Sequence, residues 1–124
     1  MSQTTTGYKT SDGLFVDSRS VNLHPSAART ATANGSVVED TAHRRTLALA
    51  LVITAASGTN PTLDVTVQTS RDGSTWYTAG TFTQATTTGT QRKVFALDRY
   101  VRAQWTIAAD ANPSFTFSLA GELV

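Results

Sequence analysis

Alternating apolar and polar positions are the clearest pattern in this sequence, and they predict β-strands. Leu63, Val65 and Val67 alternate with polar residues, and the same period of two recurs in residues 101–107 and 115–119. Successive side chains of a strand point to opposite faces, so this period places one apolar face against a core and one polar face in solvent. Each of these segments is therefore predicted to be a half-buried antiparallel strand.

Residues 46–56, TLALALVITAA, differ because both faces of the predicted strand are apolar. Large side chains such as Leu47 and Leu49 occupy one face, and small ones such as Ala48 and Ala50 occupy the other. This arrangement is typical of a strand in the centre of a sandwich, or of one whose outer face is covered by another subunit. The run is too short for a membrane helix, which needs about twenty apolar residues, so we predict no membrane partner.

Dipeptides that contain glycine predict where the chain reverses. Asn34-Gly35 lies between two short extended runs and predicts a type I′ hairpin. Asp72-Gly73 lies between two strand patterns, where glycine can adopt the left-handed conformation and aspartate can bond the backbone ahead of it. Trp76 then falls on the returning strand, where its indole is expected to cover the end of the core.

These patterns give roughly seven or eight short strands, with turn signals at intervals of about eight to twelve residues. The fold class predicted is all-β, a single antiparallel β-sandwich of jelly-roll or immunoglobulin-like type, over residues 27–124. Residues 1–26 are polar and irregular, and two interpretations stay open for them: a disordered terminus, or an extended arm that orders against a neighbouring subunit. Leu14, Phe15 and Val16 are the candidate anchors of such an arm.

Composition and charge argue against two classes of function, nucleic-acid binding and cysteine-dependent chemistry. The chain has 124 residues, a net charge of +1 and no cysteine. A nearly neutral chain without a concentrated basic face is not expected to bind nucleic acid specifically, and without cysteine there is no disulfide, thiolate metal site or thiol nucleophile. Charged residues make up 15% of the chain, below the roughly 25% of ordinary soluble domains, which suits a surface partly covered by neighbours.

The candidate chemistry is sparse, and we predict no catalytic residue, metal site or cofactor. His24 lies in the predicted arm, while His43 lies near Asp40 in what reads as a solvated turn. Neither histidine has the neighbours that a catalytic triad or a metal site requires. The basic residues are interpreted as strand-end charges that solubilise the protein or pair at an interface, with a nucleic-acid-binding stripe as the alternative; they are Arg44, Arg45, Arg92, Lys93, Arg99 and Arg102.

The stretch TSRDGSTWYT, residues 69–78, resembles two known motifs. It is similar to the sialidase-type Asp-box, but one residue is missing between the acid and the glycine. It is also similar to a hairpin of discoidin-like carbohydrate-binding sandwiches. In both families the motif is mainly a scaffold turn. Sugar binding would need an exposed aromatic ring, and of the adjacent Trp76 and Tyr77 only one can face solvent.

The chain from about residue 47 to its end resembles small virion proteins of tailed bacteriophages. The resemblance is carried by LDVTVQTSRDGSTWYTAGTFTQ and by RYVRAQWTIAADANPSFTFSLAGE, and it covers 78 of the 124 residues. It implies a non-enzymatic β-sandwich that decorates the capsid surface, binds the major capsid protein and forms a homotrimer, after synthesis in the bacterial cytoplasm. Two alternatives stay open: a tail or head–tail joining subunit, and a carbohydrate-binding adhesion module.

Overall fold

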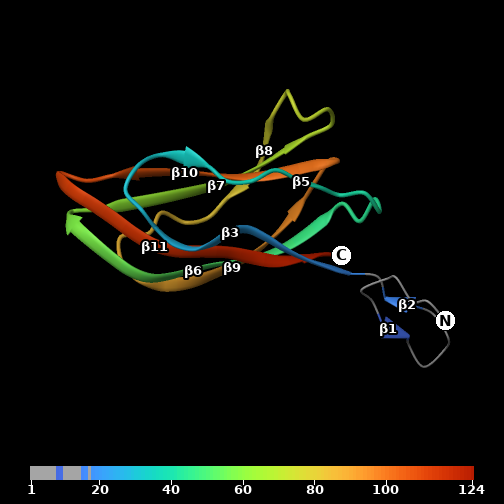
Figure 1. Cartoon of the computed structure of the whole chain (residues 1–124), viewed down its shortest axis with the longest axis horizontal. Helices are drawn as coiled ribbons and strands as arrows, with labels where there is room; N and C mark the ends of the chain where they lie inside the picture. The colour runs from blue at the N-terminus through green and yellow to red at the C-terminus, as the bar shows by residue number, and fades with distance from the viewer. Residues whose placement is uncertain (1–7, 10–14, 17) are drawn as a thin grey trace.

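The computed structural model describes residues 8–9, 15–16 and 18–124. All regular secondary structure in these residues is β-strand, and every strand pair is antiparallel. Two sheets lie face to face, with β10 and β7 in one layer and β11, β6 and β9 in the other (Figure 1). The predicted all-β antiparallel sandwich is therefore confirmed.

The first sheet has five strands, in the order β4-β10-β7-β8, and β5 also pairs with β10. We call it the β10–β7 sheet. Its strands are β4 (Ala33–Asn34), β5 (Val38–Glu39), β7 (Thr62–Ser70), β8 (Tyr77–Thr81) and β10 (Tyr100–Ala108). The longest ladder in this sheet joins β7 to β10.

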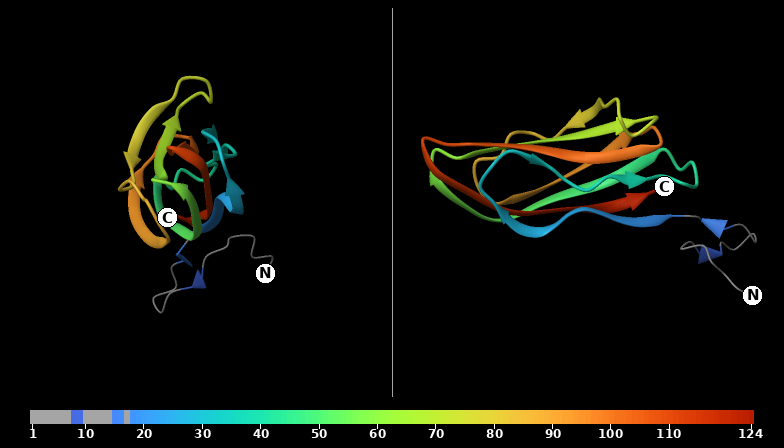
Figure 2. Two further views of the ribbon diagram at one scale, coloured as in Figure 1. Left: turned by 90° about the vertical axis from the view of Figure 1, so that its left-hand side faces the viewer. Right: turned by 45° about the horizontal axis from the view of Figure 1, so that its top comes forward.

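The second sheet has four strands, in the order β3-β11-β6-β9. We call it the β11–β6 sheet. Its strands are β3 (Arg19–Arg29), β6 (Thr46–Thr59), β9 (Gly89–Ala96) and β11 (Ala111–Leu123). The strands of both sheets run along the long axis of the molecule, so their connections gather at its two ends (Figure 2).

The core lies between the two sheets and is built from the predicted inward faces. Leu63, Val65 and Val67 of β7 are all buried, as the alternation predicts. The two-faced strand β6 points its large residues inward and its small ones outward, because only the large side chains fill the space between the layers. The largest buried side chains come from both sheets: Trp105, Phe115, Phe117, Leu47, Leu49 and Leu51.

The predicted boundary between arm and sandwich, at residue 27, is wrong. β3 begins at Arg19 and pairs with β11, so residues 19–26 belong to the sandwich. The register of β3 against β11 shifts twice, and each irregularity gives β3 one extra residue. These shifts turn the consecutive residues Leu23 and His24 inward together, which conceals the strand from a search for strict alternation.

The predicted Asn34-Gly35 hairpin is also wrong. Asn34 ends β4, which pairs with β10 instead of with a neighbouring run, and Gly35 does not have a positive φ. The Gly35 N–H donates to the carbonyl of Ala103 at 2.8 Å. A Cβ at Gly35 would lie 2.6 Å from the carbonyl oxygen of Leu23, so glycine is needed here for close approach of two chain segments and not for a turn.

The part of the predicted arm that precedes β3 is described only in pieces. Phe15 and Val16 form β2, which pairs with β1 (Tyr8–Lys9) in a two-stranded sheet. Leu14 lies outside the described residues. The docking role of Leu14, Phe15 and Val16 therefore stays a prediction.

Candidate functional site

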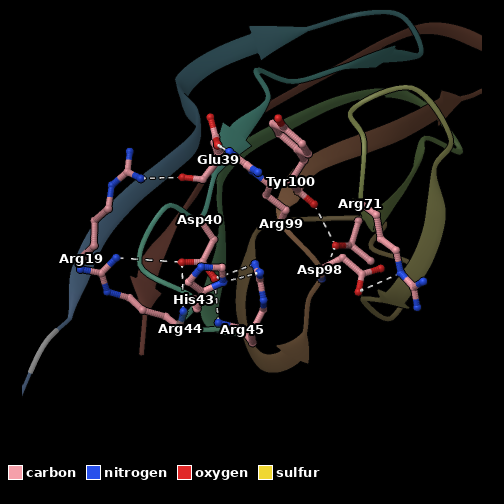
Figure 3. Close-up of polar contacts among 11 residues, drawn as sticks. Arg19, Glu39, Asp40, His43, Arg44, Arg45, Arg71, Asp98, Arg99 and Tyr100 are labelled. Atoms are coloured by element: carbon pink, nitrogen blue, oxygen red, sulfur yellow. Dashed lines mark hydrogen bonds and ion pairs between the residues drawn. The ribbon is translucent and has the colours of Figure 1, made fainter.

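Charged side chains from four separate segments of the chain meet at one end of the sandwich (Figure 3). The chain ends at the same end of the molecule (Figure 1). Because long strands bring their terminal loops together, residues far apart in sequence become neighbours here. We call this region the arginine end, and it comprises Arg19, Glu39, Asp40, His43, Arg44, Arg45, Arg71, Asp98 and Arg99.

Asp40 organises the loop between β5 and β6. Its side chain is fully buried, and its two carboxylate oxygens accept the backbone N–H groups of Arg44 at 3.1 Å and of Arg45 at 2.7 Å. The guanidinium groups of the same two arginines lie 4.0 and 3.4 Å from the carboxylate. Burial opposes ionisation, but these hydrogen bonds and charges outweigh it and lower the pKa of Asp40. Asp40 is thus a buried anion, and the prediction that it lies in a solvated turn is wrong.

The backbone of this loop carries strain. His43 has a φ of 55° and Arg45 a φ of 64°, left-handed values that non-glycine residues adopt at a cost. Such a conformation persists only where the surroundings fix it. Here the Arg45 carbonyl accepts the N–H of Leu97, and the Asp40 N–H donates to the carbonyl of Arg99. The loop is therefore held by the sandwich on both sides of its strained residues.

A hollow of about 260 Å³ lies beside this loop, lined by Arg45, Arg71, Asp98 and Arg99. The guanidinium of Arg99 donates to the carboxylate of Glu39 at 2.7 Å, and Arg71 lies 4.0 Å from Asp98. Three guanidinium groups and one carboxylate thus line the hollow. The excess of positive charge suits an anionic group, and the fixed fork of a guanidinium matches the two oxygens of a carboxylate.

Asp72 and Gly73, predicted from sequence as a structural turn, join β7 to β8 next to this hollow. Gly73 has a φ of 79°. One oxygen of Asp72 accepts the N–H groups of Ser74 at 2.8 Å and Thr75 at 2.9 Å, and the Ser70 hydroxyl accepts the N–H of Gly73. These backbone hydrogen bonds lower the pKa of Asp72. Asp72 and Gly73 thus make the local contacts expected of a turn.

Trp76, predicted to cover the end of the core, lies instead outside the core. It is half-buried, and the guanidinium of Arg102 lies 4.2 Å from the centre of its ring. Arg102 alternates along β10 with buried Val101 and Ala103, so it points to the outer face of the β10–β7 sheet. The neighbouring Tyr77 is the exposed aromatic of the pair, at 57%.

His24 is a packing residue of the sandwich. It is buried against Phe117, with ring centres 4.2 Å apart and nearly parallel planes. Its Nε2 accepts the Nε–H of Arg29 at 2.8 Å, so its Nδ1 carries the proton and donates to the Phe117 carbonyl at 2.9 Å. Burial and the charge of Arg29 lower the pKa of His24, against a smaller opposing contribution from that carbonyl. The ring is therefore held in its neutral form.

The outer face of the β11–β6 sheet is built mainly from small residues, and we call it the small-residue face. Three cross-strand rows define it: Glu122, Ala48 and Val94; Ala120, Ala50 and Arg92; and Ser118, Val52 and Thr90. Two of these nine side chains carry a charge. Val94 is 65% exposed, and a hollow of about 340 Å³ lies beside it, between Ala48 and Arg92.

The basic residues predicted as a possible stripe are divided among three regions. Arg92 lies on the small-residue face, Arg102 on the outer face of the opposite sheet, and Arg99 at the arginine end. Lys93 donates to the carbonyl of Thr81, from β9 towards β8. They do not form a continuous basic surface of the kind that follows a nucleic-acid backbone.

Sequence reasoning missed most of the arginine end. No sequence motif marks Arg19 or Arg71 as part of a site. Each is a single arginine near a strand end, and the two lie far apart in the sequence. The pair Arg44-Arg45 was visible, but its link to the buried Asp40 depends on tertiary burial. Within the described residues, no group of histidine and acidic side chains is arranged to hold a metal ion, and no helix could cross a membrane.

No model of a known protein family matches the chain, and neither does any curated protein sequence.

Proposed function

We propose that this chain is a non-enzymatic structural protein of a tailed-bacteriophage particle, a capsid decoration protein that binds the major capsid protein and stabilises the shell. The resemblance of its sequence pattern to small virion sandwiches supports this proposal. The structural observation that carries it is the small-residue face, which no other described segment covers. A charge-poor surface is what a subunit needs to lie against a protein shell with little desolvation cost.

The size of this face indicates how the attachment works. The three rows lie on three strands about 4.8 Å apart and span about five residues of about 3.3 Å rise, so the face measures roughly 240 Å². A stable protein interface buries about 800 Å² on each partner. The face therefore needs a second contact, and we propose that the residues before β3 supply it on a neighbouring shell subunit.

Oligomer formation would strengthen these modest contacts. In a homotrimer, each copy contributes one small-residue face and one N-terminal segment. Once one copy has bound the shell, the other two copies bind at a high effective concentration. The mechanism is mechanical, because a rigid sandwich that bridges adjacent capsid subunits resists their separation. The oligomeric state can be measured by native mass spectrometry, which should show three copies.

The first test is the location of the protein in purified, fractionated particles, followed by rebinding to shells that lack it. Val52→Glu places a charge on the small-residue face between Ser118 and Thr90, and we expect it to weaken shell binding about tenfold or more. Thr66→Glu is the matched control, because it puts the same charge on the outer face of β7 between Gln104 and Thr81. Deletion of residues 1–17 should also weaken binding while leaving the melting temperature of the sandwich nearly unchanged.

Three outcomes would contradict the proposal in distinct ways. Recovery of the protein with tails instead of shells would favour a tail or head–tail joining role. Absence from particles together with binding to glycans that depends on Tyr77 would favour an adhesion module. Equal loss of shell binding in Val52→Glu and Thr66→Glu would show that the small-residue face is not the contact.

A further inference from the structure

The arginine end is built to keep its cations in place. Asp40 holds the backbone of Arg44 and Arg45 by two hydrogen bonds, and the left-handed residues His43 and Arg45 are locked between contacts to the sandwich. The guanidinium of Arg45 also donates to the ring of His43 at 2.7 Å. A strained loop that is fixed by a buried carboxylate costs stability, and such strain is concentrated at sites where geometry serves binding.

The cations of this end also remain accessible. The side chains of Arg45, Arg71 and Arg99 are 37%, 86% and 54% exposed, and all three line the hollow of about 260 Å³. Figure 3 shows Asp98 between Arg71 and the Arg99–Tyr100 segment, so one acid is interspersed among the arginines. Each of these three arginines has an acidic partner, in Asp40, Asp98 or Glu39. The arginine end as a whole has five arginines against these three acids, so it carries an excess of two positive charges.

The size and charge pattern of the hollow favour a peptide carboxylate over a nucleic acid. A phosphate backbone is bound by cations arrayed over several successive phosphates, whereas this hollow is compact and its cations are interrupted by Asp98 and flanked by Glu39. Asp98 interrupts the array of cations that a run of successive phosphates would need. One or two carboxylate side chains, by contrast, match the two excess charges and can each bond a guanidinium through both oxygens.

We infer that the hollow between Arg45, Arg71 and Arg99 binds the carboxylate side chains of an acidic segment on a partner protein. Arg45 provides the restrained cation, because Asp40 fixes its backbone and its guanidinium contacts both Asp40 and the His43 ring. Arg71 and Arg99 provide the adaptable ones, since both are exposed and reach the hollow from separate loops. This inference does not rest on the proposed virion role, since it concerns the chemistry of the hollow alone.

The test is binding of a fluorescein-labelled hexaglutamate peptide to the full chain, followed by fluorescence anisotropy at about 50 mM salt, where screening is modest. Arg71→Gln/Arg99→Gln removes two charges from the hollow and is expected to weaken binding about tenfold or more. Arg92→Gln/Lys93→Gln removes the same charge from β9 and is expected to change binding less than about twofold. Melting curves of both double variants check that they are folded.

A gain of binding provides the second test. Asp98→Asn removes the acid from the hollow and should strengthen peptide binding by about twofold or more, a result that misfolding cannot produce. Equal weakening by the two double variants would show an effect of net charge only and would overturn the inference. So would undetectable binding to the unaltered chain, or tighter binding of a single-stranded hexanucleotide than of hexaglutamate.

Discussion

Two loops at the same end of the sandwich are organised by an aspartate in nearly the same way, yet they differ in burial and strain. Asp40 and Asp72 each accept the N–H groups of two consecutive residues that follow them. Asp72 is solvent-exposed, and the left-handed residue beside it is Gly73. Asp40 is buried, and the left-handed residues of its loop are His43 and Arg45.

The difference separates a local turn from a loop held by the whole fold. Gly73 adopts its conformation without a Cβ penalty, so the second turn needs only its own residues. His43 and Arg45 pay that penalty, and the contacts of Asp40 with the sandwich must offset it. The strained loop is also the one that contributes Arg45 to the hollow. The backbone strain therefore lies next to the inferred binding site.

The largest effect expected is from Asp40→Asn, which should lower the free energy of unfolding by about 2–3 kcal/mol. The amide has only one acceptor oxygen for two backbone N–H groups, and it carries no charge to balance the two arginines around it. Urea denaturation measures the loss. Asp72→Asn, the matched change in the exposed turn, should cost clearly less; equal losses would show that burial of Asp40 is not what distinguishes the loops.

Gly73→Val should cost about 1–2 kcal/mol, because valine at a φ of 79° is strained wherever its side chain points. A Cβ at this position would approach only the Tyr100 ring, at 3.8 Å, so steric conflict adds little. Gly89→Val is the control, since a Cβ there meets nothing within 4 Å and its φ is not positive. Similar stabilities for the two variants in urea would contradict the left-handed role of Gly73.

Lowering the pH should distinguish the contributions of Asp40 and His24 to the free energy of unfolding, because the two are lost in different pH ranges. Burial and Arg29 lower the pKa of His24, so the unfolded chain binds its proton more readily, and stability falls as the pH drops below about 6.5. The pKa of Asp40 is also lowered, so its contribution is fully present above about 3.8 and is lost as the pH falls through that value and below it. In His24→Gln, the decrease in measured unfolding free energy that begins near pH 6.5 should disappear, while the decrease below about pH 3.8 should remain.

Much of the fold could be predicted from the sequence because its strands are periodic. The alternation in β7, β10 and β11 reports which side chains face the core, and that signal is local. β3 was missed because its register shifts break the period around Leu23 and His24. The Asn34-Gly35 signal misled because a glycine needed for close backbone approach looks the same in sequence as one needed for a turn.

The candidate site was less predictable, because its residues become neighbours only through strand pairing. Asp72-Gly73 is a contiguous turn signal, and the structure has a turn there. Nothing near Asp40 in sequence indicates that its side chain will be buried or that its N–H will donate to the carbonyl of Arg99. The positive φ values of His43 and Arg45 have no glycine to announce them. Residues that depend on tertiary contacts for their conformation carry no local signature.

The smallest effect expected, and the sharpest test of the comparison, comes from His43→Gly. Glycine relieves the left-handed strain but loosens the unfolded chain, so a net gain of roughly 0.5 kcal/mol in unfolding free energy is expected. The same substitution at Ala42, whose φ is not positive, should instead cost about 0.5–1 kcal/mol. If the strain in this loop, or the hydrogen bond from the Arg45 guanidinium to the His43 ring, holds Arg45 in place, the more stable His43→Gly protein should bind hexaglutamate more weakly. A variant that is both more stable and equally good at binding would show that the strain has no part in presenting Arg45.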